Sequence, residues 1–164
     1  VGATYVTTAG DTTLTIGGGV AEGEVANTGT QGSDKGGFNI GVSAVTGDLT
    51  IGVGYGDGDT FVANDATAST NRQVDGSVLK AGIKYVTGDI TLALGMSAGE
   101  GKDGNFGTAG TTDDSTDSTS ASVTYAVASG VSAVVGYTTV DTNNEGSSST
   151  DGGSAWYVGA TMSF

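Results

Sequence analysis

Apolar and polar residues alternate with a period of two along most of this chain. Leu49, Ile51, Val53 and Tyr55 each follow a small or polar residue, and residues 90–97 and 120–127 repeat the pattern. Side chains of a β-strand point to its two faces in turn, so each segment predicts a strand with one apolar and one polar face. The alternation predicts nine strands, at about residues 1–8, 12–24, 37–45, 49–57, 77–86, 90–100, 118–127, 131–141 and 154–164.

Short and long connections alternate between these strands. Residues 9–11, 46–48, 87–89 and 128–130 each hold a glycine, and three of the four also hold an aspartate. Glycine and aspartate supply the backbone angles that tight hairpins need. The other connections are long, polar and acidic, at about 26–36, 58–76, 101–117 and 142–153. We therefore expect an up-and-down antiparallel sheet with all its acidic loops at one end.

Alternation alone fits both a soluble β-sandwich and a transmembrane barrel, and the aromatic residues distinguish the two. Eight of the eleven aromatics project onto the apolar face in two bands, one near each end of the strands. Aromatic rings prefer the interface between lipid and water, whereas a soluble core would hold them centrally. Trp156 and Phe164 are eight residues apart, about 20 Å along a tilted strand, near the ~25 Å apolar band of such barrels. The sequence thus predicts an all-β, antiparallel transmembrane β-barrel with bands at Tyr5, Tyr85, Tyr125 and Phe164, and at Phe38, Tyr55, Tyr137 and Trp156.

Charge and composition exclude several classes of function. The chain carries 18 acidic and 5 basic residues, for a net charge of −13, so it lacks the basic surface of a nucleic-acid-binding protein. It has no histidine and no cysteine, which excludes a Ser-His-Asp triad and thiolate metal sites. We expect no enzymatic activity. Glu22 and Glu24 fall in the apolar phase, so their strand must leave the bilayer early or contain a bulge near residues 17–19.

The last eleven residues resemble the terminal strand of bacterial outer-membrane proteins. They end in Phe164 and carry apolar residues at alternate positions before it, at Trp156, Val158, Ala160 and Met162. The whole chain also resembles general porins of the alphaproteobacterial type, similar to the Rhodobacter porins, in the hairpin 85–92, its echo at 45–51, and the acidic Gly/Ser/Thr loops. This resemblance implies a sixteen-stranded, trimeric barrel in the bacterial outer membrane, with a constriction loop folded into the pore.

The predicted strand count departs from that family. Nine is an odd number, so the first and last strands run in the same direction and cannot close an antiparallel barrel together. We therefore interpret residues 1–164 as the C-terminal portion of one barrel domain, nine strands of a predicted sixteen.

Few residues are candidates for a functional site. Lys80 and Lys84 lie in the polar phase of their strand, so both are expected to line the pore, where charged side chains set ion selectivity. Alternatively, they pair with nearby carboxylates. Arg72 falls in a long loop and is a weaker pore-lining candidate.

The acidic loops are candidates for weak divalent-cation sites at Asp57, Asp59, Asp113, Asp114 and Asp117. Clustered oxygen ligands suit Ca²⁺ or Mg²⁺, which could bridge loops to each other or to lipopolysaccharide. A solvated, negatively charged surface without bound metal is the favoured interpretation, and no other cofactor is expected.

The sequence therefore predicts a multi-pass outer-membrane porin, a homotrimer surrounded by lipid and lipopolysaccharide. It would form a water-filled channel for passive diffusion of small hydrophilic solutes and ions. One alternative is a structural or adhesive barrel that acts through its acidic extracellular loops. A soluble Ca²⁺-binding β-roll is disfavoured, because the repeat G-G-x-G-x-D is absent.

Overall fold

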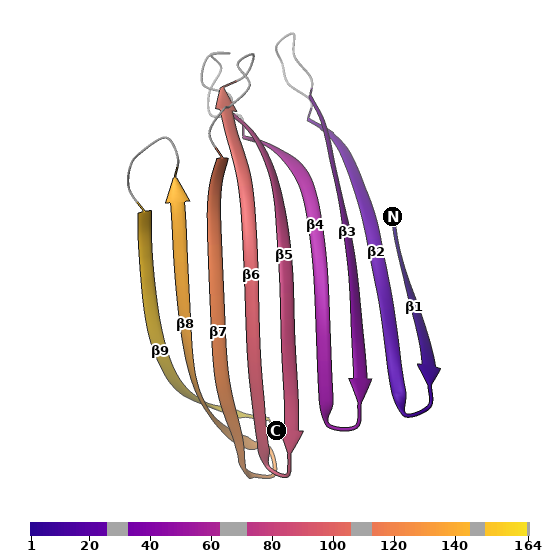
Figure 1. Ribbon diagram of the computed structural model, residues 1–164, viewed down its shortest axis with the longest axis vertical. Helices are drawn as coiled ribbons and strands as arrows, with labels where there is room; N and C mark the ends of the chain where they lie inside the picture. Colours follow the sequence, from indigo (N-terminus) through magenta and orange to yellow (C-terminus); the bar gives the residue numbers. More distant parts are fainter. Residues whose placement is uncertain (26–32, 63–71, 106–112, 145–149, 164) are drawn as a thin grey trace.

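The computed structural model describes the backbone of residues 1–25, 33–62, 72–105, 113–144 and 150–163, and omits side chains at the strand ends beside the gaps. The described residues form one nine-stranded sheet in which neighbours in sequence are neighbours in space (Figure 1). The strands are β1 (Gly2–Ala9), β2 (Thr12–Val25), β3 (Ser33–Thr46), β4 (Leu49–Val62), β5 (Arg72–Thr87), β6 (Ile90–Asn105), β7 (Asp113–Ala128), β8 (Val131–Asn144) and β9 (Thr150–Met162).

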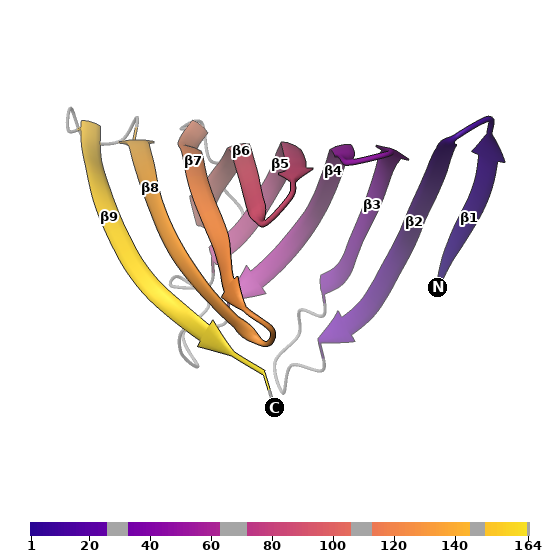
Figure 2. The same ribbon diagram turned by 90° about the horizontal axis from the view of Figure 1, so that it is seen from below.

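Every neighbouring pair of strands is antiparallel, which confirms the up-and-down topology. The sheet is curved, with β1 at one side and β9 at the other (Figure 2). The two outer strands do not pair with each other within the described residues, and both run toward the short-turn end. No helix in the described part of the chain is long and apolar enough to span a membrane.

The four short turns form where the sequence predicts them, and glycine makes each one possible. Gly10, Gly47, Gly88 and Gly130 have φ angles of 59°, 54°, 57° and 76°. Residues with a Cβ atom rarely adopt such positive values. In the first three turns glycine precedes aspartate, and that aspartate has a negative φ. Glycine at the first central position with a negative φ after it is the arrangement of a type II′ hairpin turn.

The fourth turn differs from the other three, and the register shift in the sheet lies directly beside it. Here the glycine, Gly130, comes second in the turn, and the register of β7 against β8 shifts between Ala126 and Ala128. The bulge expected near residues 17–19 is absent, because β2 keeps regular register with both neighbours. Glu22 therefore stays in the apolar phase, paired with Gly36, so β2 must leave the apolar zone just beyond Val20.

The strands are longer than the sequence predicts at the end away from the short turns. β4 continues to Val62, β5 starts at Arg72, and β7 starts at Asp113. Parts of the segments 58–76 and 101–117, expected to be loops, are thus paired strands. Their composition is loop-like on both faces, yet their backbone groups continue the hydrogen-bonded ladder of the sheet.

The sheet is a single layer without a hydrophobic core. Within the described residues no apolar side chain is buried, and large ones such as Leu94 (57% exposed) and Val158 (83% exposed) point away from the sheet. Soluble proteins rarely expose an apolar patch of this extent. Most of the exposed apolar side chains lie on one face of the sheet, which we call the apolar face; they include Ile16, Val42, Ile51, Val53, Ile83, Leu92, Leu94, Met96, Val123, Val135 and Val158.

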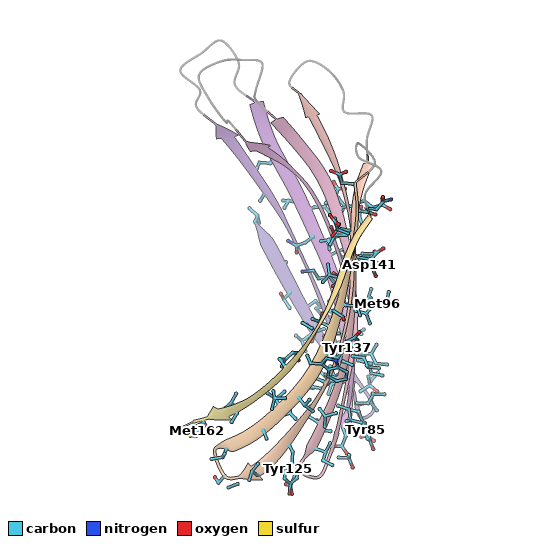
Figure 3. All side chains as sticks on the ribbon, turned by 90° about the vertical axis from the view of Figure 1, so that its left-hand side faces the viewer. Tyr85, Met96, Tyr125, Tyr137, Asp141 and Met162 are labelled. Carbon is cyan, nitrogen blue, oxygen red and sulfur yellow. The ribbon has the colours of Figure 1, made fainter. Side chains whose placement is uncertain are left out.

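The aromatic residues of the apolar face lie at two levels. Tyr85 and Tyr125 lie near the short turns, and Tyr137 lies farther up the sheet (Figure 3). Two cross-strand pairs mark the upper level: Phe38 with Tyr55, ring centroids 5.8 Å apart, and Tyr137 with Trp156, 4.6 Å apart. Phe164, predicted to complete the lower band, lies outside the described residues.

Because the strands are long, the upper aromatic band lies inside them and not at their ends. Val62 is seven residues beyond Tyr55 on β4, and Asn144 is seven beyond Tyr137 on β8. Strands of 14 to 16 residues rise about 35–40 Å at a tilt near 40°, against ~25 Å for an apolar band. The sheet thus extends beyond the apolar band on the side away from the short turns.

Candidate functional site

The opposite face of the sheet, which we call the polar face, carries mostly small side chains. Between β2 and β7 its positions are occupied chiefly by glycine, serine and threonine. Lys80 and Lys84 on β5 are the only basic residues there whose side chains are described, and both are exposed. The apolar and polar faces therefore differ in side-chain size as well as in polarity.

Lys80 stands at the centre of a row of small residues that crosses six strands. The register places Gly17, Gly41 and Gly54 on one side of it, and Ser97 and Ser118 on the other. The two serine hydroxyls are hydrogen-bonded, with their Oγ atoms 2.9 Å apart. The three glycines on one side of Lys80 have no side chains, so Lys80 has no side-chain neighbour within that part of the row.

Lys84 occupies an equivalent position four residues closer to the short turns. Its register partners are Thr50 on β4 and Ala93 on β6, and those of Lys80 are Gly54 and Ser97. None of these partners is acidic, and Gly82, which lies between the two lysines, has glycine partners on both sides. The expected polar-face position of both lysines holds, and the register supplies no carboxylate directly beside either of them.

A hollow of about 520 Å³ lies on the polar face beside Lys80. Its floor is formed by glycines, because five polar-face positions of β2–β4 have no side chain. Its polar lining comes from the side chains of Asn39, Ser43, Thr15 and Lys80, with Val78 as an apolar wall. The glycines of the floor are Gly17, Gly41, Gly52, Gly54 and Gly56.

Asp57 and Asp117, two of the predicted acidic positions, lie in the apolar phase. Asp57 pairs with Phe38 and Ser77, and its Oδ2 accepts a hydrogen bond of 3.3 Å from the Tyr55 hydroxyl. Asp117 is directly opposite Asp141 on β8. Both lie on strands, although the sequence places Asp117 in a loop, and Asp57 is level with Phe38 of the upper aromatic band.

Asp114 lies on the polar face, and its Oδ1 is buried without a hydrogen-bond partner among the described residues. The backbones of Asp59, Asp113 and Arg72 belong to β4, β7 and β5, and their side chains lie outside the described set. Arg72, expected in a loop, is the first residue of β5 and pairs with Val62 and Asn105.

The predicted acidic positions are not brought together at one place. Those of β4 and those of β7 are separated by the two intervening strands, β5 and β6. Where side chains are described, no group of three or more acidic residues is arranged to hold a metal ion.

Sequence reasoning missed two features of the polar face. The first is the hollow, which depends on Asn39 and Lys80 being brought together across β4. The second is Tyr157 on β9, whose ring lies over its register partner Gly136. Both require the cross-strand register, although an aromatic residue in the polar phase of a strand is a signal that the sequence alone contains.

Comparison with protein families gives a match to the Gram-negative porin model over residues 1–164, the whole chain. The chain belongs to the Gram-negative porin family. The apolar face is therefore the lipid-facing side of a transmembrane β-barrel sheet, and the polar face is the lumenal side. This porin is located in the bacterial outer membrane and crosses it repeatedly with its strands. No curated protein matches the chain in sequence.

Solved structures agree in fold. Outer-membrane expressed OmpT of Vibrio cholerae matches with a TM-score of 0.64 at 20% identity, over 97% of this chain and 54% of that one. In-vitro folded OmpT gives 0.63 at 20% identity, over 97% and 53%, and an OmpT mutant without loop L8 gives 0.62 at 20% identity, over 97% and 51%. The chain thus spans about half the length of the solved structures it matches, and at this identity the likeness shows the fold alone.

Proposed function

We propose that this porin forms a water-filled channel through which small hydrophilic solutes and ions diffuse passively across the outer membrane. The observation that carries the proposal is the contrast between the two faces of the sheet. The lipid-facing side holds exposed Leu94, Met96 and Val53, whereas the lumenal side opposite them holds Gly95, Ser97 and Gly54. Small, polar lumenal side chains leave room for water, while a structural barrel fills its interior with larger ones.

The channel wall requires more strands than the nine described here. Strands β1 and β9 run in the same direction, so pairing them directly would place one parallel pair in an antiparallel barrel. We propose that further strands complete the wall between them, to about sixteen, and that the assembled porin is a homotrimer of the alphaproteobacterial type. The resemblance of the hairpins at 45–51 and 85–92 to those porins supports this part of the proposal.

Channel formation is testable in planar lipid bilayers. The folded protein, identified by the change in SDS-gel migration that boiling causes, is added at low concentration while the current is recorded at constant voltage. We expect discrete, long-lived conductance steps that scale with bulk salt conductivity. A preparation that is folded and inserted but passes no current would reject the channel and leave a structural or adhesive barrel.

A further inference from the structure

The hollow beside Lys80 is the one place on the lumenal side where a cationic group, an amide and hydroxyls surround open space within the described residues. We propose that this hollow is a binding subsite for small hydroxylated carboxylates, of the sugar-acid or hydroxy-acid class, on their way through the channel. The proposal deepens the channel function and rests on it. It adds a specific site to a wall that otherwise discriminates by size and net charge.

The shape of the hollow comes from its glycine floor. Gly17, Gly41 and Gly54 are consecutive in one row across β2–β4, and Lys80 on β5 is the next residue of that row. A volume of about 520 Å³ falls within the 300–1,000 Å³ that is typical of small-molecule sites. The main-chain N–H and C=O groups of the floor are used in the hydrogen bonds of the sheet. The side chains around the floor must therefore bind the ligand.

The charge of the hollow selects an anion. Lys80 brings an ammonium group with three donors, and the residues paired with it, Gly54 and Ser97, carry no negative charge. Hydrogen bonds to a charged group are stronger than neutral ones. A carboxylate is therefore the group that we place at Lys80.

The polar side chains of the remaining lining, which stand among Val78 and other apolar atoms, can hydrogen-bond hydroxyl groups. Asn39 both donates and accepts, and Ser43 and Thr15, which are paired across β2 and β3, contribute two hydroxyls. Asn39 on β3 is in the register row of Val78, two strands away and two residues along β5 from Lys80, which separates the two backbones by about 12 Å. That span suits an extended sugar acid with its carboxylate at Lys80 and its hydroxyls over the glycine floor, and it is too long for one inorganic anion to bridge.

The chain offers a matched control for each component of the site. Lys84 has the same charge, strand and lumenal orientation as Lys80, but it does not line the hollow. A methyl group added at Gly54 would meet only Ile40 O at 3.6 Å and Gly41 Cα at 4.0 Å, and one at Gly99 would meet Thr116 O at 3.5 Å and Ser77 O at 3.8 Å. Both are ordinary contacts, so Gly54→Ala narrows the hollow and Gly99→Ala changes the lumenal side elsewhere, with the sheet intact in both variants.

The test is titration calorimetry of the full chain folded in detergent, with gluconate, glucose and acetate as probes. We expect gluconate to bind more tightly than glucose, which lacks the charge, and acetate, which lacks the hydroxyls. We expect Lys80→Gln to weaken gluconate about tenfold or more and Gly54→Ala to weaken it as well, with Lys84→Gln and Gly99→Ala close to wild type. Equal weakening by the two lysine variants, or equal affinity for gluconate and acetate, would overturn the subsite in favour of a diffuse charge effect.

The outcome is separable from that of the channel proposal, because calorimetry in detergent does not require conduction. Gluconate binding that depends on Lys80 in a protein without conductance would reject the channel and keep the site. Conductance steps with no gluconate binding would keep the channel and reject the site.

Discussion

The ring of Tyr157 on β9 occupies the space that a side chain at Gly136, its register partner on β8, would fill. Gly136 is buried by this arrangement, in a sheet where most positions are open on both sides. The tyrosine covers backbone that would otherwise face the lumen, and it is the largest side chain that the described part of the lumenal side carries near β8. Glycine at 136 is therefore favoured by packing against Tyr157 and not by backbone angle, because the φ of Gly136 is not positive.

We therefore expect Gly136→Ala to destabilise the folded sheet, since the new methyl group and the Tyr157 ring cannot share the same space. Overpacking of this kind costs about 1–3 kcal/mol. The measurement is the urea midpoint of unfolding in detergent micelles or vesicles. Gly159→Ala is the control, because its methyl group would meet only Val134 Cγ1 at 3.5 Å; equal midpoints for the two variants would show that Tyr157 moves aside freely.

Neutralising the two lumenal lysines should shift the ion preference of the channel toward cations. Lys80 and Lys84 have no acidic register partners, so in the proposed channel no paired carboxylate offsets their effect on permeating ions. We expect the double variant with Lys80→Gln and Lys84→Gln to move the zero-current potential in a KCl gradient toward the potassium equilibrium value. The shift should shrink as salt rises, because the Debye length falls from about 10 Å at 0.1 M to about 3 Å at 1 M. A salt-independent or absent shift would mean that neither side chain faces the conducting path.

An arginine in the middle of the apolar face should be far more costly than one on the lumenal side. Leu94 is 57% exposed between the two aromatic levels, so Leu94→Arg places a charge in hydrocarbon, at a cost of about 2–4 kcal/mol near the bilayer midplane. Ser120→Arg is the matched control, because Ser120 pairs with Gly95 and Thr138 on the polar face. Unfolding in phospholipid vesicles measures both. If the serine variant proved the more destabilised, the assignment of the two faces would be reversed.

Trp156 is the single tryptophan of the chain, and it is 75% exposed on the apolar face. Its place in the upper aromatic level predicts that lipids brominated near the headgroup quench its fluorescence more than lipids brominated near the chain end. Replacing it by Trp156→Phe and adding Leu94→Trp moves the fluorophore to the middle of the face, where the order of quenching should invert. The same depth profile for both proteins would contradict the two-level arrangement.

The sequence predicts the faces of the strands well, because lipid and water impose opposite demands on alternate residues within the bilayer. Residues such as Leu94 and Ser97 are assigned correctly from parity alone. Beyond the apolar zone that contrast vanishes, since both faces meet water, and β4 beyond Asp57 has the composition of a loop although it is a paired strand. For the same reason the sequence pattern places Arg72 in a loop, although it is the first residue of β5.

The register across the longer connections was beyond prediction for a different reason. A two-residue turn fixes the pairing of Thr46 with Leu49, but no such constraint fixes β4 against β5, where Gly54 meets Lys80. The hollow depends on that pairing. The bulge was also misplaced, because the glycine run 17–19 packs as regular strand, with Asn39 O close to Gly18, while the irregularity follows the position of Gly130 in the fourth turn.

Beyond Tyr55 and Tyr137 the strands of this porin continue above the membrane as a stiff, hydrogen-bonded part of the sheet, which we call the collar. In that collar the wall is held by backbone hydrogen bonds, which do not depend on the lipid. Segments attached to its rim can change in length and sequence without disturbing the residues in the bilayer. The reason is that the paired strand residues of the collar lie between those segments and the aromatic band. The wall around Lys80 is therefore separated from the rim of the sheet by paired strand residues, such as those of β4 beyond Asp57.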